Sequence, residues 1–108
     1  MVLKRDGTAE PYVREKVVTG IHKAIVNRPV SEDDVLRIVD RVEERLRRKG
    51  PEVSSQQVGL EVLSQLAKVD AVSYMRFASV YKDFQAITDF EKELVVLQKK
   101  EPAKPRSR

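Results

Sequence analysis

The 108-residue sequence predicts an α+β fold that is mainly helical and carries a small sheet. An Asp6-Gly7 pair between two short extended segments predicts a β-hairpin, because both residues tolerate the positive φ that a two-residue turn needs. Beyond the hairpin, apolar residues recur at three- and four-residue spacings, which is the period of amphipathic helices. Capping residues precede most of these segments, as expected at helix starts.

The hairpin strands are expected at Val2–Arg5 and Thr8–Tyr12, and a helix is expected to begin near Val13 and to be stopped by Pro29. One apolar stripe marks this helix: Val13, Val17, Ile21, Ala24 and Ile25. Ser31 is then a good N-cap with Asp34 in the capping-box position. The second helix buries Val35, Val39, Val42 and Leu46, and it ends in Arg47-Arg48-Lys49-Gly50-Pro51. Cations, Gly and Pro in that order suit a helix C-terminus.

The second half of the chain predicts a third strand and three further helices. The segment 52–54 is short and β-prone, so we expect it to add a strand to the hairpin. Ser54 or Ser55 caps the next helix, and Asp70 caps a fourth that runs to about residue 85. A last helix is expected to begin at Thr88 with Glu91 in its capping-box position. Its apolar side, which must dock on the domain or meet a partner, consists of Phe90, Leu94 and Leu97.

Length and composition predict one domain over residues 1–97 and a disordered basic tail over residues 98–108. The net charge is +4, but the tail accounts for it, so the charge alone does not indicate a nucleic-acid partner. The tail cations are Lys99, Lys100, Lys104, Arg106 and Arg108, against Glu101. No apolar run approaches the roughly 20 residues of a membrane span, so we expect no membrane partner and a cytoplasmic location. The chain has no cysteine, which excludes disulfides.

Three cations are expected near the hairpin turn. Lys4 and Arg5 end the first strand, and Lys16 lies in the opening turn of the helix, where free N–H groups also attract anions. This pattern predicts a site for a phosphate chain, although cations at a surface turn are often only solvated. In an ideal strand Lys4 and Arg5 point to opposite faces, so the ligand must lie along the sheet edge or a bulge must re-aim one side chain.

These residues occur in motifs that resemble the ATP-cone, a small nucleotide-sensing domain that controls ribonucleotide reductase activity. The N-terminal motifs are Lys4-Arg5-Asp6-Gly7, Glu10-Pro11-Tyr12 and Arg14-Glu15-Lys16. The run Asp70–Phe84, with Asp89-Phe90 after it, is similar to the closing helix of the cone in the bacterial repressor of ribonucleotide reductase genes. The segments 27–30 and 58–60 fit the same family. The resemblance covers about residues 2–94 and implies a four-helix bundle lidded by a three-stranded sheet.

The resemblance also implies a ligand, ATP or dATP, and a set of binding residues. Val2 and Tyr12 would flank the adenine, and Glu10 would recognise the base or the ribose. Lys4, Arg5 and Lys16 would hold phosphates, with Lys82 as a further phosphate contact. Ser55 and Val58 would close over the nucleotide. Reductase cones often carry a ribose-contacting histidine near Gly59, so sensing of the 2′-hydroxyl must differ here.

The repressor family reads DNA through an N-terminal zinc ribbon with four cysteines, and a thiolate site cannot form without thiolates. We therefore expect no zinc site in this chain, and DNA binding only through a ribbon that it lacks. Because the sequence starts one residue before the first strand, we expect a cone cut from its ribbon, as an expressed fragment rather than a naturally short protein.

Three functions compete. The leading interpretation is an allosteric ATP/dATP sensor of a transcriptional repressor of ribonucleotide reductase genes, in which the nucleotide controls a homo-oligomer and thereby DNA binding. The second is the N-terminal cone of a reductase large subunit, which the repressor-like run Tyr74–Phe84 disfavours. The third is a small basic helical DNA-binding domain, but no recognition helix stands out beyond Arg47-Arg48-Lys49. With His22 alone and no cysteine, neither a catalytic triad nor a metal site can be assembled, so no enzyme is expected.

Overall fold

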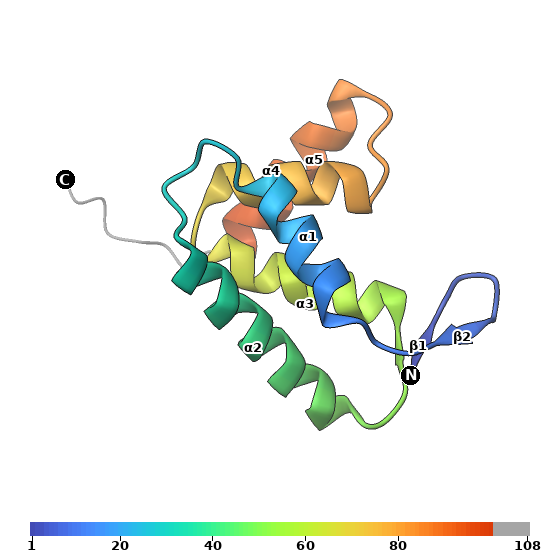
Figure 1. Cartoon of the computed structure of the whole chain (residues 1–108). Helices are drawn as coiled ribbons and strands as arrows, with labels where there is room; N and C mark the ends of the chain where they lie inside the picture. Colours follow the sequence, from blue (N-terminus) through green and yellow to red (C-terminus); the bar gives the residue numbers. More distant parts are fainter. Residues whose placement is uncertain (101–108) are drawn as a thin grey trace.

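The computed structural model describes residues 1–100, which form the predicted α+β arrangement of helices and a small sheet (Figure 1). The elements are β1 (Val2–Leu3), β2 (Ala9–Glu10), α1 (Arg14–Ala24), α2 (Glu32–Lys49), β3 (Val53–Ser54), α3 (Ser55–Ala67), α4 (Ala71–Tyr81) and α5 (Ile87–Lys100). The helices pack on one another, and the β1–β2 hairpin projects from one end of them. Within residues 1–100, none of the helices is long and apolar enough to cross a membrane.

The sheet has β1 in its centre, and the predicted third strand is confirmed. Val2 pairs with Glu10 of the antiparallel β2 and with Val53 of the parallel β3. A parallel pair needs a long crossover connection, which α1 and α2 supply here. The sheet therefore ties the hairpin to the start of α3, fifty residues away in the sequence.

The hairpin turn differs from the prediction by one residue. Lys4 N–H donates to the Thr8 carbonyl at 2.8 Å, and Gly7 N–H donates to the Lys4 carbonyl at 3.0 Å. Gly7 has φ 90°, whereas Asp6 does not have a positive φ. The Asp6 carboxylate instead accepts the Thr8 N–H and hydroxyl at 3.0 and 2.7 Å. The result is a three-residue loop with a glycine bulge, which moves Arg5 out of the strand.

Helix α1 ends at Ala24, five residues before the proline that was predicted to stop it. The chain reverses at Asn27, whose φ is 60°. Arg76 of α4 donates to the carbonyls of Ala24 and Val26 at 3.2 and 2.6 Å, so a side chain from another helix caps this terminus. Proline marks where a helix cannot continue, whereas the tertiary hydrogen bonds decide where this one ends.

The caps of α2 and α3 are capping boxes. Ser31 and Asp34 exchange side-chain and backbone hydrogen bonds at the start of α2, as predicted. At the start of α3 the same exchange joins Ser54 to Gln57, which resolves the choice between the two serines. Gly50 ends α2 as predicted, but as the C-cap residue and with φ 112° and ψ −177°, which lies outside the left-handed helical region and is open essentially to glycine alone.

The helix before the α4–α5 junction is shorter than predicted. Helix α4 ends at Tyr81, about four residues early, and Asp83 follows with φ 57°. Helix α5 begins one residue earlier than predicted. Asp89 accepts the backbone N–H groups of the two residues before the helix at 2.7 and 3.1 Å, so Asp89 rather than Glu91 is the capping acid.

Helix α5 also continues through Lys100, three residues into the segment predicted as a tail; residues 101–108 of that segment lie outside the described residues. The three apolar residues predicted on one side of this helix differ in burial. Leu97 is 5% exposed and joins the core, whereas Phe90 and Leu94 stay more than two-fifths exposed. The helix therefore docks through Leu97 and leaves the other apolar side chains open.

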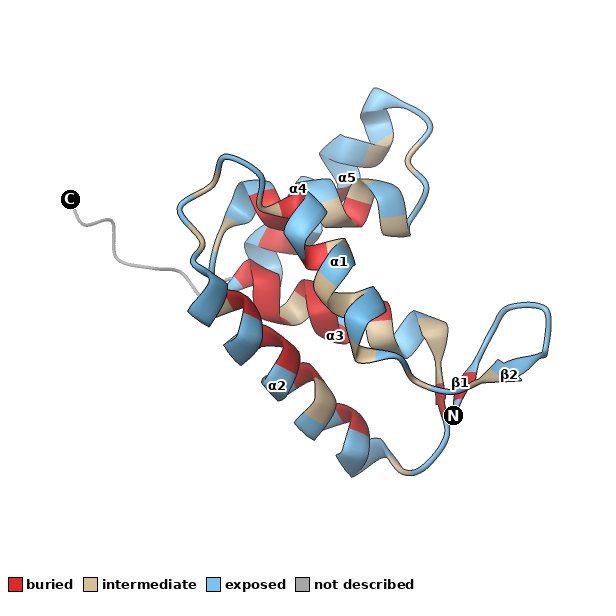
Figure 2. Ribbon diagram, viewed as in Figure 1, coloured by how far each residue is buried: buried red, intermediate tan, exposed pale blue. Residues whose placement is uncertain are grey.

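The core lies between α1, α2, α3 and α4 (Figure 2). The predicted buried face of α2 is confirmed, because Val35, Val39, Val42 and Leu46 are all buried. Val13 is 38% exposed because it precedes α1, so the apolar stripe of that helix begins at Val17. Tyr74 is fully buried, and the family-like run on α4 therefore contributes to the core.

A buried carboxylate attaches α5 to α4. Glu93 of α5 is 4% exposed, accepts the Tyr74 hydroxyl at 2.5 Å and pairs with Lys82 Nζ at 2.9 Å. Burial, followed by the carboxylate, raises the pKa of the Tyr74 phenol, which stays a neutral donor. A buried carboxylate is tolerated when it is paired and hydrogen-bonded, as Glu93 is.

A second ion pair joins the α1–α2 loop to α4. Arg28 binds the Asp70 carboxylate with Nε and Nη2 at 2.9 and 2.8 Å. Asp70 is also the predicted N-cap of α4, accepting the N–H and hydroxyl of Ser73 at 2.9 and 2.7 Å. These bonds, led by the one from Arg28, hold the pKa of Asp70 well below its usual range.

We predict that Asp70→Ala lowers the free energy of unfolding at pH 7 by about 2–4 kcal/mol, the sum of a helix cap and a charge-assisted pair. The lowered folded-state pKa means that protonation favours the unfolded chain. The carboxylate's contribution is therefore complete above the unfolded value of about 3.9 and is lost as pH falls from there through the folded pKa. Urea unfolding at pH 7 and near pH 2 measures both effects. A difference between parent and variant that stays constant with pH would contradict the assignment.

Candidate functional site

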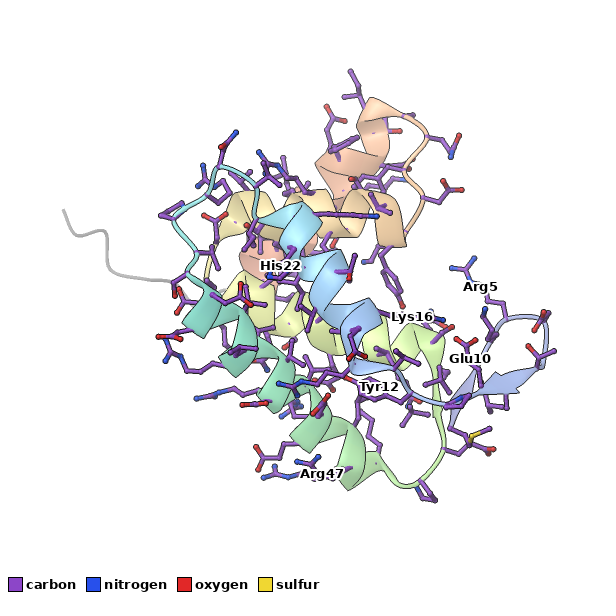
Figure 3. All side chains as sticks on the ribbon, viewed as in Figure 1. Arg5, Glu10, Tyr12, Lys16, His22 and Arg47 are labelled. Atoms are coloured by element: carbon purple, nitrogen blue, oxygen red, sulfur yellow. The ribbon has the colours of Figure 1, made fainter. Side chains whose placement is uncertain are left out.

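Two of the three predicted cations, Lys4 and Lys16, contact one carboxylate. Lys4 Nζ lies 3.7 Å from Oε1 of Glu10, and Lys16 Nζ lies 3.6 Å from Oε2. Arg5, carried outward by the bulged loop, lies on the same side of the hairpin, which faces α1 (Figure 3). The difficulty that Lys4 and Arg5 point to opposite faces of a strand is therefore removed by the turn geometry.

The contacts of Glu10 are weak enough to be replaced. Both ion pairs are longer than 3.5 Å, and the lysine side chains are 49% and 67% exposed. Exposed pairs of this kind contribute about 0–1 kcal/mol. Three cations against one carboxylate leave an excess of two positive charges, so a ligand with several negative charges can displace Glu10 from the lysines.

The cations border an apolar groove of about 360 Å³. Its walls come from α1, the start of α3 and the end of α4, and Arg5, Lys16 and Ser55 are its polar members. The apolar lining residues are Val17, Val58, Val62, Phe77 and Tyr81. A groove of this size, apolar with a few cations at its edge, has the character of a small-molecule site for a ligand with a flat apolar part and an anionic part.

Tyr81 forms one wall of the groove because Gly59 makes room for it. The Tyr81 hydroxyl donates to the Gln56 carbonyl at 2.5 Å, and the ring stacks on Phe77 with centroids 6.0 Å apart. A Cβ atom on Gly59 would lie only 2.0 Å from the Tyr81 ring. Burial raises the pKa of Tyr81, and the charge of Arg5 partly offsets this, which places the guanidinium in the field of the phenol.

Tyr81 was not among the residues predicted for the site, because aromatic residues at helical spacing are usually core. A glycine in the middle of a helix costs about 1 kcal/mol relative to alanine, so Gly59 was the available signal that something approaches α3 closely. Ser55 and Val58 do line the groove, and Ser55 is free of the capping role, which Ser54 fills.

Five predicted residues do not line this groove. Lys4 and Glu10 lie beside it, where Glu10 contacts both Lys4 and Lys16. The other three lie elsewhere. Val2 is buried in the core at 7% exposure. Tyr12 turns to the opposite side, where its hydroxyl donates to Glu43 of α2 at 2.9 Å. Lys82 pairs with the buried Glu93. Tyr12 was predicted beside the adenine from its place in the motif, but the packing of the chain against α2 decides where its ring points.

Tyr12 borders a second cavity, of about 430 Å³, between the N-terminus and the end of α2. Arg14 crosses this side of the molecule to Glu43 at 2.7 Å and Asp40 at 3.0 Å. The positive charge of this second cavity is therefore partly neutralised. Glu43 also forms part of its wall, and its carboxylate would repel an anion. The first groove suits a polyanion better.

His22 is an exposed residue of α1 whose Nε2 lies 2.8 Å from Glu32. Across residues 1–100, no group of three histidine, cysteine, aspartate or glutamate side chains is placed to hold a metal ion.

We predict that Gly59→Ala forces the Tyr81 ring from the groove and lowers the free energy of unfolding by about 1–3 kcal/mol, despite the better helix propensity of alanine. In a Tyr81→Ala background the same change loses its clash and becomes neutral or stabilising. Urea unfolding of the two single variants and the double variant measures this coupling. Additive effects would mean that the ring does not rest on Gly59.

Comparison with known proteins places the chain in a family. The ATP cone domain family matches residues 1–87. Proteins named "Transcriptional repressor NrdR" are similar to the chain, and we compare three. The protein of Tropheryma whipplei (strain Twist) is 51% identical over 92 residues, 84% of this chain and 63% of the relative. That of Acidothermus cellulolyticus is 50% identical over 107 residues, 98% of this chain and 62% of the relative.

The relative from Corynebacterium efficiens is 46% identical over 100 residues, 92% of this chain and 64% of that protein. The chain thus spans about three-fifths of the length of these relatives. All three are named as transcriptional repressors and not as enzymes. The match over residues 1–87, on a fold of helices with a small three-stranded sheet, shows that this chain belongs to the ATP-cone family.

Proposed function

We propose that this chain is the nucleotide-sensing domain of a transcriptional repressor of ribonucleotide reductase genes. It binds ATP or dATP in the groove between the hairpin, α1, α3 and α4, and the bound nucleotide sets the assembly of the repressor and thereby its binding to DNA. The observation that carries the proposal is the cluster of Lys4, Arg5 and Lys16 at the mouth of an apolar groove, where the two lysines contact Glu10.

The triphosphate binds at the cations. Lys4, Arg5 and Lys16 supply charge-assisted donors, and Lys16 belongs to the first turn of α1, where free backbone N–H groups add a favourable field. The base enters the apolar part of the groove, where Phe77 and Tyr81 offer aromatic surface. Ser55 supplies a hydroxyl at the groove edge.

Glu10 has two roles in this proposal. Without nucleotide it neutralises part of the charge of Lys4 and Lys16, which reduces the repulsion between these two cations. When the triphosphate takes over the lysines, the Glu10 carboxylate is released to accept a hydrogen bond from the ribose or the base amino group. Nucleotide binding then replaces the weak ion pairs between Glu10 and the lysines by stronger charge-assisted contacts between phosphate and the lysines.

The relatives' names favour this function over a cone from a reductase large subunit. Sensing requires no bond to be made or broken. It requires only that two assemblies bind ATP and dATP with different affinities, because a ligand shifts an equilibrium by its differential affinity for the two states.

We predict that the chain binds ATP about 10- to 100-fold more tightly than AMP, because AMP forfeits at least one charge-assisted contact worth about 1.5–3 kcal/mol. Lys4→Ala and Lys16→Ala each reduce ATP affinity and bring it closer to that of AMP. Both residues are exposed, so their replacement changes the free energy of unfolding by no more than about 0.5 kcal/mol. Titration calorimetry measures the affinities.

Lys92→Ala is the matched control, since it removes an exposed lysine of α5 outside the groove. It should leave ATP affinity within about twofold of the parent. Equal affinity for AMP and ATP would exclude a triphosphate site. A large loss of stability in Lys4→Ala or Lys16→Ala, measured without nucleotide, would make that lysine structural.

A further prediction concerns assembly. Phe90, Leu94 and Val95 leave apolar surface on α5 between 41% and 50% exposed, while Leu97 holds the helix to the core. We expect light scattering to give different masses for the free, ATP-bound and dATP-bound chain. A complete shift between two assemblies, from 1:99 to 99:1, requires about 5.5 kcal/mol of differential binding, which several sites can share. Identical masses, with binding confirmed, would show that the isolated domain senses nucleotide without changing assembly.

A further inference from the structure

Helix α2 carries a row of exposed arginines along one side. At 100° per residue, Arg37, Arg41, Arg45 and Arg48 fall within an arc of about 80°. Asp40 and Glu43 lie outside this arc and pair with Arg14 of α1, whereas Asp34 lies within it and pairs with Arg37. The arginine side faces the direction of α3, since Arg45 reaches Glu61 of α3 at 2.7 Å.

Lys68, at the C-terminal cap of α3, completes this basic edge, which we define as Arg37, Arg41, Arg45, Arg48 and Lys68. Three of its members have carboxylate partners: Arg37 with Asp34, Arg45 with Glu61 and Arg48 with Glu44. Among residues 1–100, Arg41 and Lys68 form no ion pair, and they line the same groove of about 230 Å³ between α2 and α3. Asp34 also lines this groove, and its carboxylate is neutralised by Arg37 at 2.8 Å.

An unused donor lines that groove as well. Gln65 of α3 is 5% exposed, and its side-chain amide forms no hydrogen bond to any residue from 1 to 100. No buried polar side-chain atom among residues 1–100 lacks a hydrogen-bond partner, so this amide is open to solvent through the groove. The amide of Gln65 and the unpaired cations of Arg41 and Lys68 together make a set of donors for an oxygen anion.

We propose that the basic edge binds the phosphate backbone of duplex DNA, with one phosphate in the groove formed by Arg41, Gln65 and Lys68. This is a second anion site, separate from the Lys4, Arg5 and Lys16 cluster. The choice of DNA as the polyanion rests on the proposed function, since the domain of a repressor works close to its operator.

The shape of the edge favours a long polyanion over a single ion. Arg37, Arg41 and Arg45 follow one another in steps of about 6 Å along α2, so the cations form a row. DNA presents a row of phosphates, and backbone contacts of this kind are independent of sequence. The edge contains no aromatic side chain for stacking on bases, which disfavours single-stranded nucleic acid.

Fluorescence anisotropy with a labelled duplex of about 20 base pairs of arbitrary sequence tests the proposal. The full chain is titrated at salt concentrations between about 50 and about 200 mM. The double variant Arg41→Gln/Lys68→Gln should bind about tenfold more weakly, and the slope of log affinity against log salt should fall by about 1, because the two side chains hold one phosphate.

The matched control is Lys23→Gln/Lys92→Gln, which removes the same charge from exposed positions on α1 and α5. It should change DNA affinity by less than about threefold and leave the slope nearly unchanged. Equal losses in the two double variants would overturn the proposal, because net charge alone would then explain binding. Binding of a poly-glutamate peptide as tight as that of the duplex would overturn the choice of DNA.

Calorimetry with ATP on the same proteins separates this inference from the proposed function. Both double variants should keep the parent's ATP affinity, which also shows that they are folded. If the parent failed to bind ATP while Arg41→Gln/Lys68→Gln still weakened DNA binding selectively, the nucleotide sensor would be excluded and the basic edge would stand. If ATP bound and the duplex did not, the edge would be excluded and the sensor would stand.

Discussion

The parallel pairing of β1 with β3 is the constraint on which the site depends. Val2 lies opposite Val53, and β3 leads directly into α3, so the hairpin cannot move independently of the first turn of that helix. The hairpin brings Lys4, Arg5 and Glu10, and α3 brings Ser55, Val58 and Gly59. Two residues of parallel strand therefore bring the hairpin cations beside the start of α3, which follows them by about fifty residues in the sequence.

Charge compensation by Glu10 explains how three cations coexist at a surface without a ligand. The carboxylate contacts two lysines at distances that give little stability, so the empty site is held together loosely. By contrast, the ion pairs that join helices are short and less exposed: Arg28 with Asp70, and Lys82 with Glu93. These two pairs connect elements of the fold, whereas the weaker pairs of Glu10 lie at the proposed nucleotide site.

The two remaining charged surfaces have different consequences. Arg14 neutralises the acidic side of α2 by reaching Asp40 and Glu43, which joins α1 to α2. The other side of the same helix carries Arg41, which forms no ion pair with any residue from 1 to 100, and it borders the groove that Gln65 lines. One helix therefore packs its apolar face into the core, joins α1 through Asp40 and Glu43, and presents the basic edge proposed for a polyanion.

The sequence by itself determined the secondary elements and the composition of the cation cluster. Local chemistry suffices for those: Ser31, Asp70 and Gly50 act within one helical turn, and Lys4, Arg5 and Lys16 belong to adjacent elements. The turn register also depends on a local hydrogen bond, from the Thr8 N–H to Asp6. Tertiary structure decided the end of α1 and the direction of Tyr12, because Arg76 and Glu43 act there through hydrogen bonds between residues far apart in the sequence. The same holds for Tyr81, whose place against Gly59 exists only once α3 and α4 are packed.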